Sequence, residues 1–192
     1  MRPQAVGVLL ALLFWAVPLE ASAPRYIGVD RCATCHSEAP KPVTSFWSQG
    51  PHAKAYKTLL GEPARALAAK LGLKHPEQQP GCLACHTTAA GVPQSQKSSS
   101  FKLEDGVSCE ACHGPGQRYA RFEVMSRAAM LRLRKPEKAN QYGQKFGLVM
   151  PDQKFCATCH GPSRTIAGAK YLSPTYKGYE PQAAWEKIRH WP

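Results

Sequence analysis

The apolar positions in the first half of the chain follow short helical patterns that glycine and proline interrupt. A helical turn is expected at residues 43–49, a helix at 51–60 and another at 63–72. The second and third of these begin at a proline, which suits a first helical turn because that turn leaves its N–H groups without intrahelical partners. Strand-like alternation is weak along the whole sequence. These patterns predict a mainly α fold with extensive irregular structure.

The second half of the chain predicts one longer helix and a short helix at the end. The longer helix covers residues 117–134 and is stopped by Pro136. The short helix covers residues 181–190. The stretch 87–100 is small and polar and is expected to be a surface excursion, and 161–179 is rich in glycine, proline and tyrosine. The inner face of the longer helix is predicted to consist of Tyr119, Phe122, Met125, Ser126, Ala129 and Leu133.

The N-terminus has the pattern of an export signal. An uncharged apolar run at residues 5–17 precedes a small-x-small motif at 21–23. The run is shorter than the about 20 residues that span a bilayer. We therefore expect residues 1–23 to be a signal peptide and residues 24–192 to be the exported domain, located in the periplasm or outside the cell. The alternative is an uncleaved leader that anchors the chain in the membrane.

Four copies of a Cys-x-x-Cys-His motif account for all eight cysteines. They read CATCH, CLACH, CEACH and CATCH in chain order. Four disulfides or structural zinc sites would use the cysteines, but neither explains a histidine directly after each pair. Attachment of c-type haem does, because two thiols bind one edge of the porphyrin while the histidine ligates the iron. The expected haem-binding cysteines are Cys32, Cys35, Cys82, Cys85, Cys109, Cys112, Cys156 and Cys159, and the expected iron ligands are His36, His86, His113 and His160.

Four haems would contribute to the hydrophobic core and would also explain the positive net charge of the chain. They use every cysteine and would form much of the core, so we expect a single multihaem domain wrapped around four covalently bound haems. The formal net charge is +12, a value that often indicates binding to nucleic acid or to an anionic surface. Lysine and arginine are spread along the chain, however, and the haem propionates supply negative charges that this excess can balance. The sequence therefore does not predict a nucleic-acid partner.

The second axial ligand of each iron decides what a haem does. An iron with two axial histidines has both axial positions filled, which favours electron transfer. An iron with one empty axial position can bind small ligands. Four haems with two histidines each need eight histidines, and the chain has 7. At least one iron within a subunit therefore lacks a second histidine. Candidates for the second positions are His52, His75 and His190, together with Met125, whose sulfur would raise the reduction potential.

The order of these motifs resembles the tetrahaem cytochrome c-554 family of exported electron carriers. The resemblance rests on the first CATCH, the GPHAKAYKTL segment after it, the closely spaced GCLACH and GVSCEACHGPG, the later KFCATCH and a histidine near the C-terminus. It implies a mostly helical chain around haems in close stacked and perpendicular contact. It also implies that His52 ligates the fourth haem and His190 the third, while the second haem, held by His86, has an open face.

The chain departs from the family pattern after CEACHGPG, where the family places a histidine for the first haem. Residues 114–155 contain no histidine. Met125 is nearest the expected position, and His75 is a substitute from elsewhere in the chain. A histidine of a neighbouring subunit is a third alternative, as in filament-forming tetrahaem cytochromes. The sequence leaves these three alternatives open.

The preferred function is electron transfer between redox protein partners outside the cytoplasm. One alternative is reduction of a small nitrogen oxide, or ligand binding, at a five-coordinate haem. Multihaem nitrite reductases usually carry lysine in place of the motif histidine at the active haem, whereas all four motifs here end in histidine. This difference favours a carrier over an enzyme. A second alternative is a subunit of an extracellular cytochrome filament.

Overall fold

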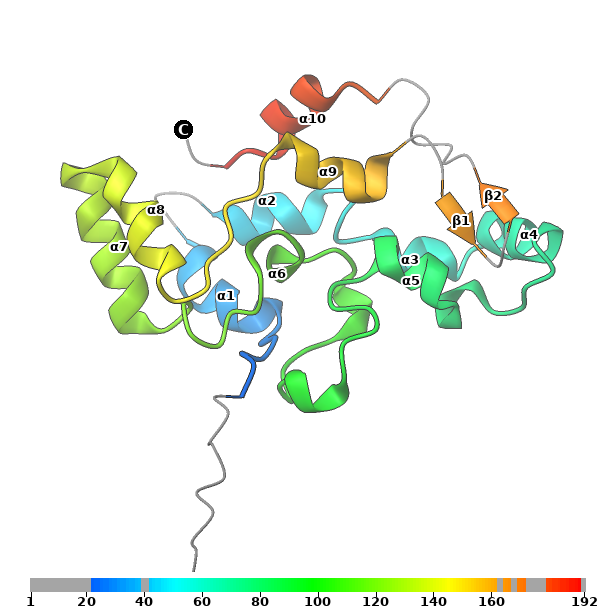
Figure 1. Ribbon diagram of the computed structural model, residues 1–192, viewed down its shortest axis with the longest axis horizontal. Helices are drawn as coiled ribbons and strands as arrows, with labels where there is room; N and C mark the ends of the chain where they lie inside the picture. Colours follow the sequence, from blue (N-terminus) through cyan, green and yellow to red (C-terminus); the bar gives the residue numbers. More distant parts are fainter. Residues whose placement is uncertain (1–21, 39–41, 162–163, 167–168, 172–178, 191–192) are drawn as a thin grey trace, which may run out of the picture.

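The structure is a computed structural model that describes residues 22–38, 42–161, 164–166, 169–171 and 179–190 (Figure 1). The predicted export signal lies outside the described residues except at its last two positions. The α-helices are α1 (Val29–His36), α2 (Val43–Gln49), α3 (Ala55–Leu59), α4 (Glu62–Lys70), α5 (Pro80–His86), α6 (Cys109–His113), α7 (Phe122–Arg134), α8 (Pro136–Gln144), α9 (Gln153–His160) and α10 (Pro181–Ile188). Short 3₁₀ helices are η1 (Pro76–Gln78), η2 (Gln94–Gln96) and η3 (Leu103–Asp105), and two strands are β1 (Arg164–Ile166) and β2 (Ala169–Tyr171).

The described chain is mainly helical, which confirms the predicted fold class at that level. Helix α2 covers the predicted residues 43–49, and α4 matches the predicted helix 63–72 to within two residues at either end. Among the residues that the structure describes, every helix is too short or too polar to span a bilayer. The connections between helices range from a single residue between α7 and α8 to the long segment between α5 and α6 (Figure 1).

The predicted helix 51–60 is wrong at its start, because α3 begins only at Ala55. The four residues before it form turns in which the Lys54 N–H donates to the Pro51 carbonyl and the Ala55 N–H donates to the His52 carbonyl, both at 3.1 Å. The His52 carbonyl also accepts from the Val107 N–H at 3.0 Å. A tertiary contact therefore holds this backbone in a conformation that a continuous helix would not allow.

The predicted helix 117–134 ends at Arg134 as expected, but its predicted start and the role given to Pro136 are wrong. It begins only at Phe122, and Pro136, expected to stop it, instead opens α8, where it takes the first helical turn. Helices α7 and α8 pack against each other (Figure 1). The Arg132 guanidinium donates to the Asn140 side-chain oxygen at 3.1 Å across this contact. Proline tolerates the first turn of a helix as readily as it ends one, which explains the error.

The inner face predicted for α7 is also wrong. Phe122 is 76% exposed and Leu133 is 87% exposed, whereas Val124 on the other side of the helix is only 4% exposed. Tyr119 is buried, but it lies before the helix. The sequence carries apolar residues on two sides of this helix. Which side is buried depends on the packing of α8, which the sequence did not predict.

A buried carboxylate ties the N-terminal segment to α6. The Glu110 side chain is 1% exposed, and its oxygens accept from the backbone N–H groups of Ile27, Gly28 and Gly116 at 2.6–3.0 Å. Because an ionised carboxylate accepts charge-assisted hydrogen bonds, three donors satisfy it in an interior site. The start of α1 and the loop after α6 are thereby fixed relative to each other.

The end of the described chain contains a small hairpin that the sequence did not predict. Strands β1 and β2 are antiparallel, with Ile166 opposite Ala169. The Ile166 side chain lies 3.1 Å from the position a Cβ at Gly81 would take, so the hairpin packs on the start of α5. Helix α10 packs on α9 and ends two residues before the predicted His190.

The hydrophobic core of the described residues is small. Apart from proline and glycine, six apolar residues are buried, and they are distributed over five helices and one loop. They are Val29, Leu59, Ala68, Tyr119, Val124 and Ala139. The helices therefore cover little apolar surface on one another.

Candidate haem centres

Each Cys-x-x-Cys-His motif closes a helix. Helices α1, α5, α6 and α9 all end at the motif histidine, and their motif cysteines lie four and one residues before it. Residues three and four apart lie on the same side of a helix. The first cysteine and the histidine of a motif therefore share a face, with the second cysteine directly beside it. This arrangement fits the attachment of one flat group by two sulfurs and one imidazole.

Three of the four motifs are neighbours in space. Cys32 of the first motif neighbours Cys109 of the third. The interaction between the two thiols, followed by burial, raises the pKa of Cys32, whereas the same interaction lowers the pKa of Cys109. Burial, followed by the nearness of Cys156 in the fourth motif, raises the pKa of Cys112 to about 11. These sulfurs stand where thioether bonds to haem would form. The first motif is thus a neighbour of the third, and the third a neighbour of the fourth.

His52 faces the histidine of the fourth motif. The ring centres of His52 and His160 are 5.9 Å apart, with 55° between the ring planes. Two metal–imidazole bonds of about 2 Å, extended by the reach from each nitrogen to its ring centre, require a separation of about 6 Å. Burial, and then the neighbouring His160, lowers the pKa of His52, which favours the neutral ring that binds a metal. Tyr179, which the sequence did not single out, stacks on His160 at 4.8 Å.

His190 faces the histidine of the third motif in the same way. The ring centres of His113 and His190 are 5.8 Å apart. Nδ1 of His113 lies 2.9 Å from the Val149 carbonyl oxygen, and Nδ1 of His190 lies 3.0 Å from the Ile188 carbonyl oxygen. A ring that donates from Nδ1 to a carbonyl keeps Nε2 as its metal-binding nitrogen. In both rings Nε2 is therefore the nitrogen that suits a metal ligand.

The histidines of the first and second motifs have different surroundings. His86 has Nδ1 at 2.8 Å from the Ala55 carbonyl oxygen and 3.1 Å from the Thr58 hydroxyl, so α3 orients its ring. His36 is half-buried at the end of α1, and burial, followed by the nearness of His190, lowers its pKa. Neither ring is in ring contact with another histidine, although the structure describes all seven.

The two other predicted ligands are His75 and Met125, and His75 is not in ring contact with a motif histidine. His75 is 65% exposed and its Nδ1 lies 3.3 Å from a carboxylate oxygen of Glu77. Its backbone is left-handed, with φ of 52°, directly before the buried Pro76. Met125 is half-buried in α7. The structure thus brings together His52 with His160 and His190 with His113, and it does not bring His75 against a motif histidine.

The sequence missed the backbone groups that orient these rings. The carbonyls of Ala55, Ile188 and Val149 hold three of them, and the Val107 N–H holds the His52 backbone. Every residue carries such groups, so no side-chain pattern could have identified them. The sequence does offer a backbone signal at Gly106, a glycine with a positive φ of 67° that lies three residues before the third motif.

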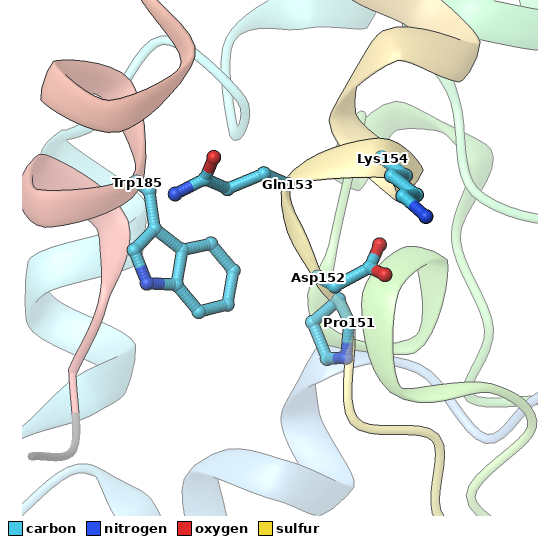
Figure 2. Close-up of a pocket in the computed structure, with 5 residues that line it drawn as sticks. All are labelled: Pro151, Asp152, Gln153, Lys154 and Trp185. Atoms are coloured by element: carbon cyan, nitrogen blue, oxygen red, sulfur yellow. The ribbon is translucent and has the colours of Figure 1, made fainter.

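An open cleft of about 410 Å³ lies between α9 and α10. Figure 2 shows Gln153 pointing from α9 towards Trp185 of α10, with Asp152 and Lys154 on the other side. The Gln153 side chain hydrogen-bonds with that of Gln182 in α10. In the described part of the chain, no three histidine, cysteine, aspartate or glutamate side chains gather as a structural zinc site would require.

Comparison with known proteins agrees with this arrangement. Residues 31–114 match the family described as cytochrome c554 and c-prime. Cytochrome c-554 of Nitrosomonas europaea is 29% identical over 168 residues, which cover 81% of this chain and 67% of that protein. No solved structure matches the chain. With four haem-attachment motifs in order and this likeness over 81% of its length, the chain is similar to the cytochrome c-554 family of c-type cytochromes, which bind haem covalently.

Proposed function

We propose that the chain is an exported tetrahaem cytochrome that passes electrons between redox protein partners outside the cytoplasm. Each motif would hold one haem through its two cysteines and ligate its iron through its histidine. Each bound iron supplies a one-electron redox centre. The polypeptide sets its potential through the axial ligand, burial and nearby charge. The predicted signal peptide supports export.

The two facing histidine pairs are the observation that carries this proposal. Separations of 5.9 Å and 5.8 Å suit an iron held from both sides. Such irons exchange electrons without opening a coordination position. The carbonyls that fix the rings of His113 and His190 would limit ligand movement during a change of oxidation state, which favours rapid transfer.

The arrangement of the motifs supports a continuous path. Contacts between cysteines link the first, third and fourth motifs. The segment around α3 joins the fourth motif to the second, because His52 faces His160 while the Ala55 carbonyl orients His86. The small apolar core also supports the proposal, since four haems would supply the buried apolar surface that the side chains lack.

Replacing His52 by alanine is expected to convert one haem of four from low to high spin, and replacing His190 is expected to convert a different one. Each variant removes the second imidazole of one facing pair. Electron paramagnetic resonance of the oxidised protein measures this change. His75→Ala is the matched control, because His75 is exposed and should leave the spectrum unaltered. A His52→Ala or His190→Ala spectrum identical to wild type would remove that histidine from the ligand set.

One observation favours a second candidate, which is binding or reduction of a small nitrogen compound at the haem of His86. No second histidine lies in ring contact with His86. We expect this haem to bind nitric oxide without turnover, so the reduced protein should consume nitrite or hydroxylamine no faster than a heat-treated sample. Sustained turnover in the presence of an electron donor would establish the enzyme instead.

A further inference from the structure

The structure accounts for every histidine of the chain. Four of the seven form the two facing pairs, and three remain, namely His36, His75 and His86. His36 and His86 belong to motifs and would each hold one iron from one side. His75 is therefore the one remaining histidine of the chain that could be the second axial ligand of either iron.

His75 is poorly placed for that task. Its side chain is 65% exposed and is paired with Glu77, two residues further along the same loop. The adjoining η1 helix contacts α3, α4 and α5, so His75 lies near α5, the helix that ends at the second motif. Helix α1, which ends at His36, instead contacts α2 and α6.

His190 is near His36, but it cannot serve two irons. Its ring faces His113 at 5.8 Å, and its Nδ1 is engaged with the Ile188 carbonyl at 3.0 Å. An imidazole has two nitrogens, and a neutral ring that donates from one has a single nitrogen left for a metal. If His190 ligates the iron held by His113 of the third motif, it cannot also ligate the iron held by His36 of the first.

We propose that the haem held by His36 has no histidine on its second face and takes a small exogenous ligand there, as a second exchangeable site beside the haem of His86. This inference rests on the proposed tetrahaem cytochrome. The ligands would be small molecules with one lone pair directed at the iron, such as carbon monoxide on the reduced haem.

The test is the number of carbon monoxide molecules bound per chain by the fully matured, reduced protein, together with the high-spin ferric signal. We expect two molecules per chain and a high-spin signal that integrates to two haems. His52→Ala and His190→Ala should each raise both counts to three, which assigns the two wild-type sites to His36 and His86 by elimination. His75→Ala should leave the counts at two.

Met125→Leu separates this proposal from methionine ligation. The substitution keeps an apolar side chain of similar size in α7, so the fold should be retained. We expect the counts to remain at two. Counts of one in wild type and two in Met125→Leu would overturn the proposal in favour of a methionine ligand. A count of one that rises to two when the protein is diluted to monomers would overturn it in favour of a neighbouring subunit's histidine.

The failure of this inference can be distinguished from the failure of the proposed function. A protein whose mass includes four haems but which binds one carbon monoxide per chain contradicts only the open site at His36. A protein whose mass includes fewer haems contradicts the tetrahaem cytochrome itself.

Discussion

Glu110→Gln is expected to lower the free energy of unfolding by about 3 kcal/mol. The carboxylate of Glu110 is 1% exposed and accepts from three backbone N–H groups, two in the segment before α1 and one after α6. A glutamine amide has one acceptor oxygen and turns an NH₂ group towards donors, so at least one buried N–H loses its partner. Chemical denaturation followed by far-ultraviolet circular dichroism measures the change.

Glu104→Gln is the matched control for Glu110→Gln. Glu104 is exposed in η3, and the same loss of charge should change stability by less than about 0.5 kcal/mol. Equal effects of the two substitutions would mean that net charge, rather than the hydrogen bonds between Glu110 and the N-terminal segment, governs stability. That result would contradict the role given to Glu110.

Gly106→Ala is expected to destabilise the protein by about 3 kcal/mol and to raise the high-spin fraction of the haem held by His160. The residue has φ of 67°, which costs a side chain about 1–2 kcal/mol. An added Cβ would also lie 2.7 Å from the His52 carbonyl oxygen and 3.1 Å from that of Ala53, and such crowding adds about 1–3 kcal/mol. Relief of this contact moves the His52 backbone away from the Val107 N–H that holds it.

Gly72→Ala separates backbone strain from displacement of His52. Gly72 has φ of 69°, but nothing lies within 4 Å of the added Cβ. Gly72→Ala should therefore lower the free energy of unfolding by only about 1–2 kcal/mol and leave the haem spectrum unchanged. If Gly72→Ala and Gly106→Ala had equal effects on stability and neither changed the spin state, Gly106 would have no part in positioning His52.

The haem-attachment motifs could be identified from the sequence because their chemistry is local. Two cysteines and a histidine within five residues carry the whole signal, and the structure places each motif at a helix end. The mainly helical class and α2 were predictable for a similar reason, since glycine and proline bound short apolar segments. These predictions needed no knowledge of distant contacts.

The features that the sequence could not predict depend on contacts between distant segments. Pro136 is compatible with both the end and the start of a helix, and its role follows from the packing of α8 on α7. Glu110 resembles any charged residue inside a short motif, yet its three partners come from positions 27, 28 and 116. The turn at His52 depends on a backbone N–H 55 positions further along, at Val107.

The second axial ligands could be predicted in part. The family resemblance implied that His52 and His190 reach the fourth and third motifs, and the structure brings both against those histidines. Ligation itself stays a prediction. For the first motif the sequence left Met125, His75 and a neighbouring subunit as alternatives. The position of His75 beside Glu77 argues against His75 as a ligand, because an exposed, hydrogen-bonded ring has to leave both solvent and its partner to reach a buried iron.

The most direct test of the account is the intact mass of the protein purified from a host that matures c-type cytochromes. We predict the mass of the processed polypeptide plus four haems, retained after denaturation because thioether bonds hold each one. A mass equal to that of the bare polypeptide, or haem that separates completely when the chain unfolds, would contradict the account.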